Sequence, residues 1–405
     1  MLIKFALRHN LIYPLQLIIY QFLREGILVL IDIIYGFKNS SAYTPIVFLA
    51  ELLGGLTFYL LQKLSFKRKR AEKDHYFMSI KLIQDKAKND FKQADNYFKI
   101  VFLIFITAYI DFAQFLYRGI VIPKLNISTT LIFRLNGLST IAVAIYYIYI
   151  LKSSIQKHHK FSLIIIGICL AITLGTEFLF QKIDIFLSIG EFFSALCIIL
   201  FKHMFAPLVD LLEKYLFEYD YLNPFLLLML EGLVGTALSF LLCFTPNYFD
   251  DFILVFKKFT RWKIVLFIFL IILYFIFSAL RNAFKMITTK IYSPMIRNLT
   301  DNILNPFTLT FFFIVGYDLT SDKKRDYLHF SINLILTIII SICSCIYGEF
   351  IILFCCGLEK NTHEQISKRA KLVGFDSIYE LNERDGESEG KDNYSIISDD
   401  NSEKF

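Results

Sequence analysis

Long apolar runs dominate the chain, and shorter polar segments separate them. A helical run of about 18 or more apolar residues can cross the roughly 30 Å hydrocarbon core of a bilayer. The pattern predicts ten membrane-spanning helices, over residues 11–36, 44–64, 98–118, 128–151, 161–180, 184–202, 224–245, 262–284, 295–317 and 329–356. We therefore expect an all-α polytopic membrane protein.

Two of the predicted helices carry polar interruptions. Arg24-Glu25 interrupts the first one, so residues 1–36 form either one tilted span or an interfacial helix followed by a shorter segment. The Arg24-Glu25 pair itself is either functional or the edge of that interfacial helix. The ninth is polar in its first half, with Arg297, Asn298, Asp301, Asn302 and Asn305. Lipid cannot solvate such a stretch, so we expect these side chains to face protein or water.

Two distant segments repeat one pattern around an intramembrane acid. A Pro opens the segment, a Glu follows about two turns later and a Gly lies one turn beyond, as Pro45, Glu51 and Gly55 and again as Pro224, Glu231 and Gly235. Arg134 and Arg297 lie early in the fourth and ninth segments and form a second pair of corresponding residues. Two halves of five spans each must enter the membrane in opposite senses, which is the inverted repeat of many secondary transporters. We expect repeats over 1–180 and 181–356.

Composition and charge agree with a membrane protein and suggest its orientation. The chain is 56% hydrophobic and 19% charged, whereas soluble domains have more charge and less apolar content. The net charge of +6 follows from topology rather than from nucleic-acid binding, because Lys and Arg accumulate in cytoplasmic loops. Loops on one side, including the basic loop 65–97, carry about 24 Lys and Arg against about 10 on the other. We expect both termini in the cytoplasm and an endomembrane location (Golgi, endosome or lysosome).

The last segment, 357–405, differs from the rest of the chain. Its Gly, Ser, Asp and Glu content predicts a disordered acidic cytoplasmic tail. Tyr394-Ser395-Ile396-Ile397 fits a Tyr-x-x-apolar signal that endosomal sorting adaptors bind, and a plain solvated tail is the alternative.

Short motifs in six segments resemble those of one transporter superfamily. They are Glu51 with its following Gly, Asp111 after Ala108-Tyr109-Ile110, Arg134-Leu135-Asn136-Gly137, Glu231-Gly232-Leu233 with Gly235, Arg297 to Asp301, and Tyr347-Gly348-Glu349. Their order from about residue 44 to 357 resembles the drug/metabolite transporter superfamily (EamA-like), and in particular the F-type members of solute carrier family 35. The resemblance implies ten spans in two inverted five-helix repeats and a nucleotide-sugar-like substrate.

Intramembrane charges are the candidates for substrate binding or gating. Acids can hold protons or cationic groups, and Arg can pair with an anion such as phosphate. The candidates are Glu51, Asp111, Arg134, Asn136, Glu231, Arg297, Asp301 and Glu349. Of these we favour Arg134 and Arg297 as anion contacts. The alternatives are that Arg297 and Asp301 pair at i,i+4, that acids near span ends lie in headgroup water, and that Glu349 gates or caps its helix.

Other polar and small residues favour plainer interpretations. Glu177, Asp184 and Glu191 flank a predicted turn and are interpreted as surface residues. His158-His159 lies in a basic segment without a neighbouring acid or Cys, which favours a solvated flank over a metal site. Gly54, Gly55, Gly232 and Gly235 favour close helix packing over hinges. We expect no metal and no other cofactor.

The sequence thus predicts a secondary transporter of a small polar or anionic metabolite that works by alternating access. No enzyme is expected, because the sequence lacks a His-x4-Asp box, a His-Glu-x-x-His motif and a phosphate-binding Gly-rich loop. A channel filter such as Thr-Val-Gly-Tyr-Gly is also missing. The alternative is a non-transporting membrane subunit or sorting receptor. The expected partners are the lipid bilayer and a small-molecule substrate, and a homodimer stays open.

Overall fold

The computed structural model describes residues 3–5, 12–36, 43–70, 94–116, 129–150, 155–180, 189–218, 220–242, 244, 250–315 and 323–353. Nearly all of them lie in helices. The elements in chain order are β1 (Ile3–Phe5), α1 (Ile12–Tyr35), α2 (Thr44–Arg70), α4 (Ala94–Leu116), α6 (Thr129–Arg134), α7 (Gly137–Tyr149), α8 (Lys157–Phe180), α9 (Ile189–Glu218), α10 (Pro224–Leu242), α11 (Asp250–Lys258), α12 (Arg261–Ile291), α13 (Pro294–Val315), α14 (Lys323–Tyr347) and β2 (Ile351–Leu353).

The start of α10 shows how local sequence sets a helix boundary. Pro224 occupies the first helical position, where a missing N–H costs nothing because the first turn has no intrahelical acceptor. The side chain of Asn223 accepts the Phe225 N–H at 2.9 Å and so caps one of the orphan donors of that turn. Pro45 lies in the first turn of α2 in the same way.

Within the described residues, six helices are long and apolar enough to cross a membrane: α2, α4, α8, α10, α12 and α14. The four other predicted spans coincide with α1, α9, α13 and the pair α6 and α7. Large apolar side chains cover the outer surface, for example Trp262, Phe269 and Ile276 on α12. A lipid environment suits such a surface. The chain is a helical, multi-pass membrane protein.

Several predicted boundaries were wrong. The hydropathy pattern predicts a loop over 203–223, but α9 continues to Glu218, and α12 continues to Ile291 rather than ending at 284. The predicted span 128–151 is interrupted at Leu135-Asn136, where α6 ends and α7 begins. Residues 12–35 form one continuous helix, which favours the single tilted segment over an interfacial helix for that part of the chain. Charged side chains lower the local hydropathy without ending a helix that packs against protein.

Helices α2 and α10 cross with an unusually short distance between their backbones. A Cβ on Gly232 would lie 2.3 Å from the backbone N of Leu52, and one on Gly55 would lie 2.6 Å from the backbone N of Met229. Both distances are far below van der Waals contact, so glycine is required on each helix where the other approaches. The packing interpretation of these glycines is confirmed.

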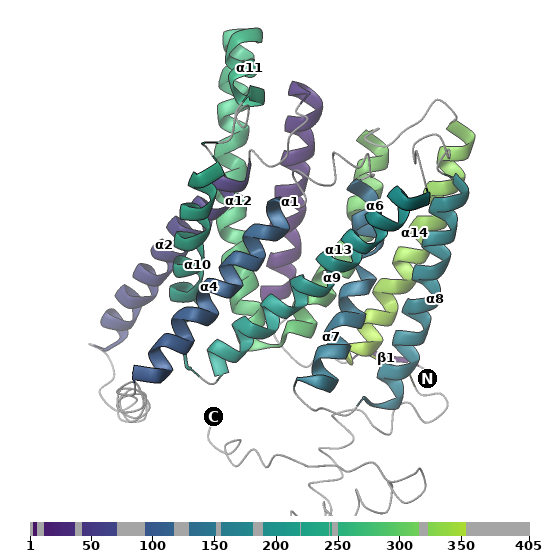
Figure 1. Cartoon of the computed structure of the whole chain (residues 1–405), viewed down its shortest axis with the longest axis horizontal. Helices are drawn as coiled ribbons and strands as arrows, with labels where there is room; N and C mark the ends of the chain where they lie inside the picture. The colour runs from purple at the N-terminus through teal and green to yellow at the C-terminus, as the bar shows by residue number, and fades with distance from the viewer. Residues whose placement is uncertain are drawn as a thin grey trace, which may run out of the picture.

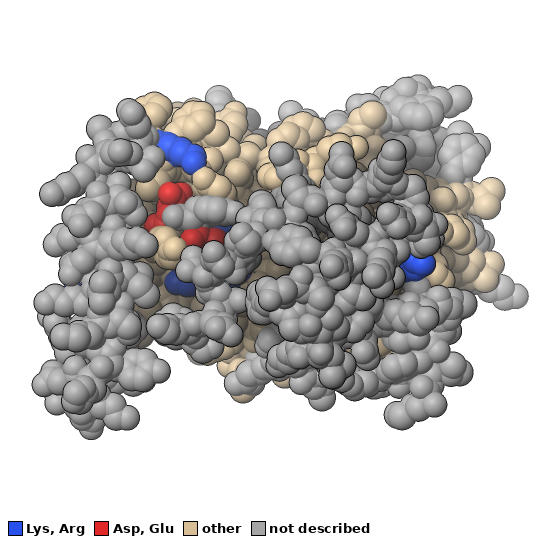
Figure 2. Space-filling view, turned by 90° about the horizontal axis from the view of Figure 1, so that it is seen from below, with Lys and Arg blue, Asp and Glu red and all other residues tan. Residues whose placement is uncertain are grey.

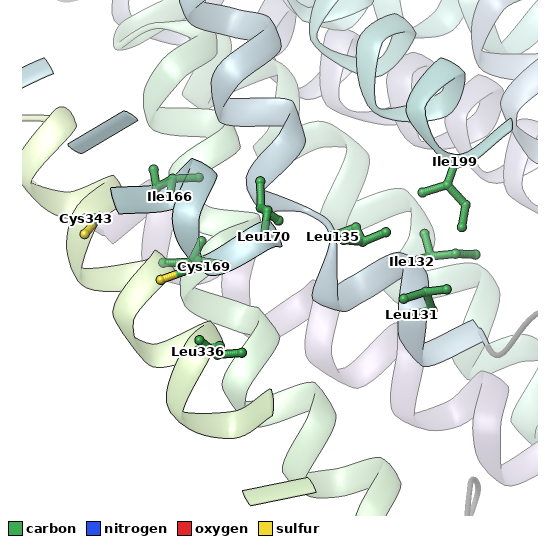
Figure 3. Packing of buried hydrophobic residues seen from close by; sticks show 10 residues of the cluster. Leu131, Ile132, Leu135, Ile166, Cys169, Leu170, Ile199, Leu336 and Cys343 are labelled. Atoms are coloured by element: carbon green, nitrogen blue, oxygen red, sulfur yellow. The ribbon is translucent and has the colours of Figure 1, made fainter. Parts of the chain in front are cut away.

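The helices form a bundle of two groups (Figure 1). Helices α2, α4, α10 and α12 lie on one side and α7, α8 and α14 on the other, with α9 and α13 between them. Helix α1 packs against α12 and α13, and α8 packs against α14. Apolar residues of α6, α8, α9 and α14, such as Leu131, Ile166, Ile199 and Leu336, form the core of the second group (Figure 3).

The two strands mark one end of the bundle. Strand β1 pairs antiparallel with β2, with Ile3 opposite Leu353, and α11 lies at the opposite end (Figure 1). We call the end with the strands the strand end. The predicted acidic tail 357–405, with Tyr394-Ser395-Ile396-Ile397, and the sequence between 71 and 93 lie outside the described residues.

Candidate functional site

Lys285 of α12 is the centre of a buried group of ionic contacts. Its Nζ lies 2.6 Å from Oε1 of Glu213, 3.5 Å from Oδ1 of Asp210 and 3.7 Å from Oδ2 of Asp111. Glu213 and Asp210 come from α9, and Asp111 comes from α4. One ammonium group therefore faces three carboxylates from two other helices.

Arg297 of α13 extends this group. Its guanidinium contacts Asp301 one turn later on the same helix, and its Nε lies 3.8 Å from Oδ2 of Asp210. Asp210 thus lies between Lys285 and Arg297. We name Asp111, Asp210, Glu213, Lys285, Arg297 and Asp301 the central cluster. It joins α4, α9, α12 and α13.

Glu51 lies in a neighbouring hydrogen-bond chain. Asn282 donates from Nδ2 to Oε1 of Glu51 at 2.8 Å and accepts from Nη1 of Arg281 at 2.6 Å. Arg281 also donates from Nε to Oε1 of Gln21 at 3.4 Å. The acid of α2 is therefore tied through α12 to α1. The neighbouring residues Arg24 and Glu25 of α1 are buried and form an ion pair at 2.6 Å, which favours a paired role over a helix edge.

Several carboxylate oxygens in the described part of this region have no hydrogen-bond partner. Among the described residues, Oε2 of Glu213, Oε1 of Glu231 and Oδ1 of Asp301 are buried and accept no hydrogen bond. The central cluster holds four carboxylates and two basic groups. A buried charge without a partner costs several kcal/mol, so the excess carboxylates must gain protons, water or a bound cation.

The central cluster lies in the half of the bundle nearer the strand end. Lys285 is six residues before the end of α12 and Arg297 three residues after the start of α13, so they lie roughly 9 and 5 Å from these helix ends. Figure 2 views the molecule from below, the side on which Figure 1 shows β1, and acidic and basic side chains gather in one area of this face between uncharged residues.

Arg134 belongs to a separate polar group. It contacts Glu177 of α8, and His329 of α14 lies 3.0 Å from Oε1 of Glu177. Asn333 also reaches that oxygen at 3.5 Å. Glu177 is only 2% exposed, so its assignment to the surface was wrong. The predicted span 161–180 already contained Glu177, but its position near the helix end suggested the surface; the carboxylate instead faces the interior of the bundle, where Arg134 compensates it.

The polar first half of α13 is buried, as expected. Asn302 donates to the hydroxyls of Thr140 on α7 and Ser344 on α14, at 2.7 and 2.8 Å. Asn136, at the break between α6 and α7, donates to Asn305 at 2.9 Å. Side chains of α13 thus face the central cluster on one side and neutral polar partners on the other.

Glu349 lies in the turn between α14 and β2, beside His158 at the start of α8. The distance from Nε2 of His158 to Oε1 of Glu349 is 3.3 Å. His158 is 3% exposed, so the expectation of a solvated flank without a neighbouring acid was wrong. The acid is distant in sequence, and only the pairing of α8 with α14 brings it close.

The eight predicted candidates therefore divide among several places. Asp111, Arg297 and Asp301 meet in the central cluster, and Glu51 and Glu231 lie in the same buried region. Arg134, Asn136 and Glu349 lie elsewhere. The sequence-based interpretation missed Lys285, Asp210 and Glu213, because all three fall in predicted loops. Their signal was the spacing of Arg281 with Lys285 and of Asp210 with Glu213, which puts each pair on one helix face. Asp184 and the side chain of Glu191 lie outside the described parts of the chain.

No protein-family model matches this chain, and the comparison with curated proteins gives no match. The resemblance to the drug/metabolite transporter superfamily therefore stays a prediction that rests on the quoted motifs.

Proposed function

We propose that this protein is a secondary transporter that moves a small polar solute by alternating access, with the central cluster as its binding and coupling site. The observation that carries the proposal is the meeting of Lys285 and Arg297 with carboxylates from three helices inside a membrane bundle. Ionisable groups at such depth are costly and are typically retained where a solute or an ion passes. The interruption between α6 and α7 lies against Asn305 of α13, the helix that also carries Arg297, and broken helices are common in transporters.

We further propose that the ten helical segments form two inverted repeats, in which α1, α2, α4, α7 and α8 correspond to α9, α10, α12, α13 and α14. The packing supports this pairing. When the two halves are exchanged, the contact between α1 and α12 corresponds to the contact between α9 and α4. In the same way, the contact between α2 and α12 corresponds to the contact between α10 and α4. The contact between α1 and α13 likewise corresponds to the contact between α9 and α7. Gly232 meets Leu52 where α2 crosses its proposed counterpart α10, as expected close to a pseudo-two-fold axis.

The charges of the central cluster favour a proton or a cationic group as one of the transported species. Four carboxylates and two bases leave an excess of negative charge, which a proton or a cation can neutralise. A solute with a positive group would compete with Lys285 for Glu213 and Asp210. The predicted anionic, nucleotide-sugar-like substrate would instead have to displace Asp301 from Arg297 or Glu177 from Arg134, because each arginine contacts a carboxylate.

The positive-inside rule orients the proposed transporter. With both termini in the cytoplasm, the strand end and the central cluster face the cytoplasmic half of the membrane. The solute would then meet the cluster from that side, and closure there would accompany opening at the α11 end. An endomembrane location fits a carrier that exchanges a cytoplasmic metabolite.

Transport in proteoliposomes tests the proposal. Purified protein is reconstituted with a pH-sensitive dye inside, and labelled choline, an amino acid mixture, a nucleotide and a nucleotide sugar are offered under an imposed pH gradient. We expect one class to enter together with proton movement. Glu213→Gln and Lys285→Met should abolish this flux in correctly folded protein, whereas Glu218→Gln, an exposed acid of the same helix, should not.

Two results would count against the proposal. A protein that moves none of the offered classes, yet keeps its fold, would favour the non-transporting subunit or sorting receptor. Unchanged flux in Glu213→Gln and Lys285→Met would place the site elsewhere. If only Arg134→Ala and Arg297→Ala abolish flux of the nucleotide sugar, the anionic substrate is favoured and the cation is not.

A further inference from the structure

A second group of potential ligands lies at the strand end, apart from the central cluster. His158 and His159 open α8, and Glu349 follows α14. One ligand atom from each of the three residues can be chosen such that all lie within 4.8 Å of one another. The two imidazole rings are 4.1 Å apart between centroids, and His159 packs on Tyr347 at 4.6 Å.

His158 is the member that points to a ligand. It is 3% exposed, yet neither ring nitrogen takes part in a hydrogen bond among the described residues. Its Nε2 approaches Oε1 of Glu349 to 3.3 Å without hydrogen-bond geometry. A buried imidazole normally has a partner for at least one nitrogen, because an unsatisfied buried polar atom costs about 1–3 kcal/mol. An ion bound to Nε2 of His158 would satisfy this imidazole, and the carboxylate of Glu349 is close enough to share the ion.

We propose that His158, His159 and Glu349 bind a divalent transition-metal cation, with Zn²⁺ as the best-suited ion. Imidazole and carboxylate are ordinary zinc ligands, at about 2.0–2.2 Å from the metal. In tetrahedral geometry two such ligand atoms lie about 3.3 Å apart, which equals the distance between His158 and Glu349. His159 would be the third ligand, in exchange for a present hydrogen bond such as the one that its Nδ1 accepts from the Gln156 N–H at 3.4 Å, and the fourth position would stay open to water.

The site would connect separate parts of the chain. His158 and His159 belong to the first turn of α8, whereas Glu349 lies between the end of α14 and β2, which pairs with β1 near the N-terminus (Figure 1). A bound ion would therefore hold α8, α14 and the strand pair together. This proposal does not depend on transport, because the site is separate from the central cluster.

The backbone at Glu349 provides an informative variant. Glu349 has φ 57°, in the left-handed region that glycine prefers at helix C-termini. Glycine at this position should relieve the local strain while it removes the carboxylate. The relief of backbone strain offsets part of the lost contact with His158, so Glu349→Gly is expected to fold and to lose the metal ligand, which separates loss of binding from loss of structure.

Zn²⁺ binding to the untagged, full-length protein in detergent tests the proposal. After metal removal by a chelator, the protein is titrated with zinc chloride against a competing chelator, and the bound metal is measured. We expect one Zn²⁺ per chain and a rise in the thermal unfolding temperature. His158→Gln, His159→Gln and Glu349→Gln should each weaken binding at least about tenfold, and His363→Gln should bind as the original protein does.

Glu349→Gly should lose the zinc-dependent rise in unfolding temperature while it still unfolds cooperatively in the absence of metal. The proposal is overturned if the original protein binds no zinc at this stoichiometry. It is equally overturned if Glu349→Gly keeps the full rise, or if zinc binding depends on His363 rather than on His158 and His159.

Discussion

Replacement of Gly232 by Ala tests the crossing of α2 and α10 directly. The new Cβ would lie 2.3 Å from the backbone N of Leu52 and 2.8 Å from its Cα, whereas ordinary contact begins at 3.4 Å. The obstructing atoms belong to the backbone and cannot rotate away. The two helices must therefore separate by about 1 Å, and a core forced to expand in this way loses about 1–3 kcal/mol of stability.

The separation should also reach the polar region beside it. Glu51 precedes Leu52, and its hydrogen bond to Asn282 depends on the present distance between α2 and α12. We therefore expect Gly232→Ala to lower the free energy of unfolding and to weaken any function that depends on Glu51. Gly55→Ala should act similarly, because its Cβ would meet the backbone of Met229 at 2.6 Å.

The assay is thermal unfolding of the purified variants in one detergent, with Gly167→Ala as the control. Gly167 lies inside α8, and a Cβ added to it would meet no other described atom within 4 Å outside its own stretch of helix. Alanine there should be neutral or stabilising by about 0.5–1 kcal/mol, because it is the better helix former. The reasoning is refuted if Gly232→Ala unfolds at the temperature of the original protein, or if Gly167→Ala is destabilised as much.

Three further predictions concern the buried polar groups. Lys285→Met leaves the surrounding carboxylates without their cation and should cost about 3–5 kcal/mol of stability at neutral pH. Thermal unfolding at pH 8 and pH 5 should show a smaller loss of stability at pH 5, where protons can replace the missing charge. An equal loss at both pH values would contradict this. Glu177→Gln should cost a similar amount of stability, because it leaves the charge of Arg134 uncompensated. Substitution of the exposed Glu218 by Gln should cost at most about 1 kcal/mol in chemical unfolding. Equal effects of the two substitutions would argue against a buried ion pair at Glu177. Asn302→Leu removes the donor to the buried hydroxyl of Ser344, whereas Thr140 keeps its hydrogen bond from Asn298. The variant should lose about 1–3 kcal/mol, and unchanged unfolding would show that these hydrogen bonds contribute nothing.

The positions of the helices could be predicted from the sequence because they depend on local properties. A membrane helix satisfies its own backbone hydrogen bonds, so an apolar run of sufficient length specifies it without reference to partners. All ten predicted spans overlap helical segments. Close helix packing at Gly55 and Gly232 could also be predicted, but the sequence did not indicate that their two helices pack against each other.

The composition of the site could not be predicted in the same way, because hydropathy falls where charges enter a helix. The predicted span ends at 284, one residue before Lys285, whose charge makes the helix resemble a loop. Asp210 and Glu213 were missed for the same reason. Pairs such as Arg134 with Glu177 and His158 with Glu349 join residues far apart in the chain, and only the packing of α8 with its neighbours brings them together.

The central cluster also suggests how binding and motion would be coupled in the proposed transporter. It ties α9 to α12 through Lys285 and Glu213, and to α13 through Asp210 and Arg297. Breaking a buried pair with both groups charged costs about 3–5 kcal/mol, which reduces the population of a separated state by about two to more than three powers of ten. Neutralisation of Glu213 or Asp210 by a proton or a cationic group would remove most of that cost. The contacts of α13 with α7 and α14 are neutral hydrogen bonds worth about 1 kcal/mol each, and they can exchange without a change in charge. We therefore expect the coupling step to be the separation of α9 from α12 and α13, controlled by the occupancy of their carboxylates.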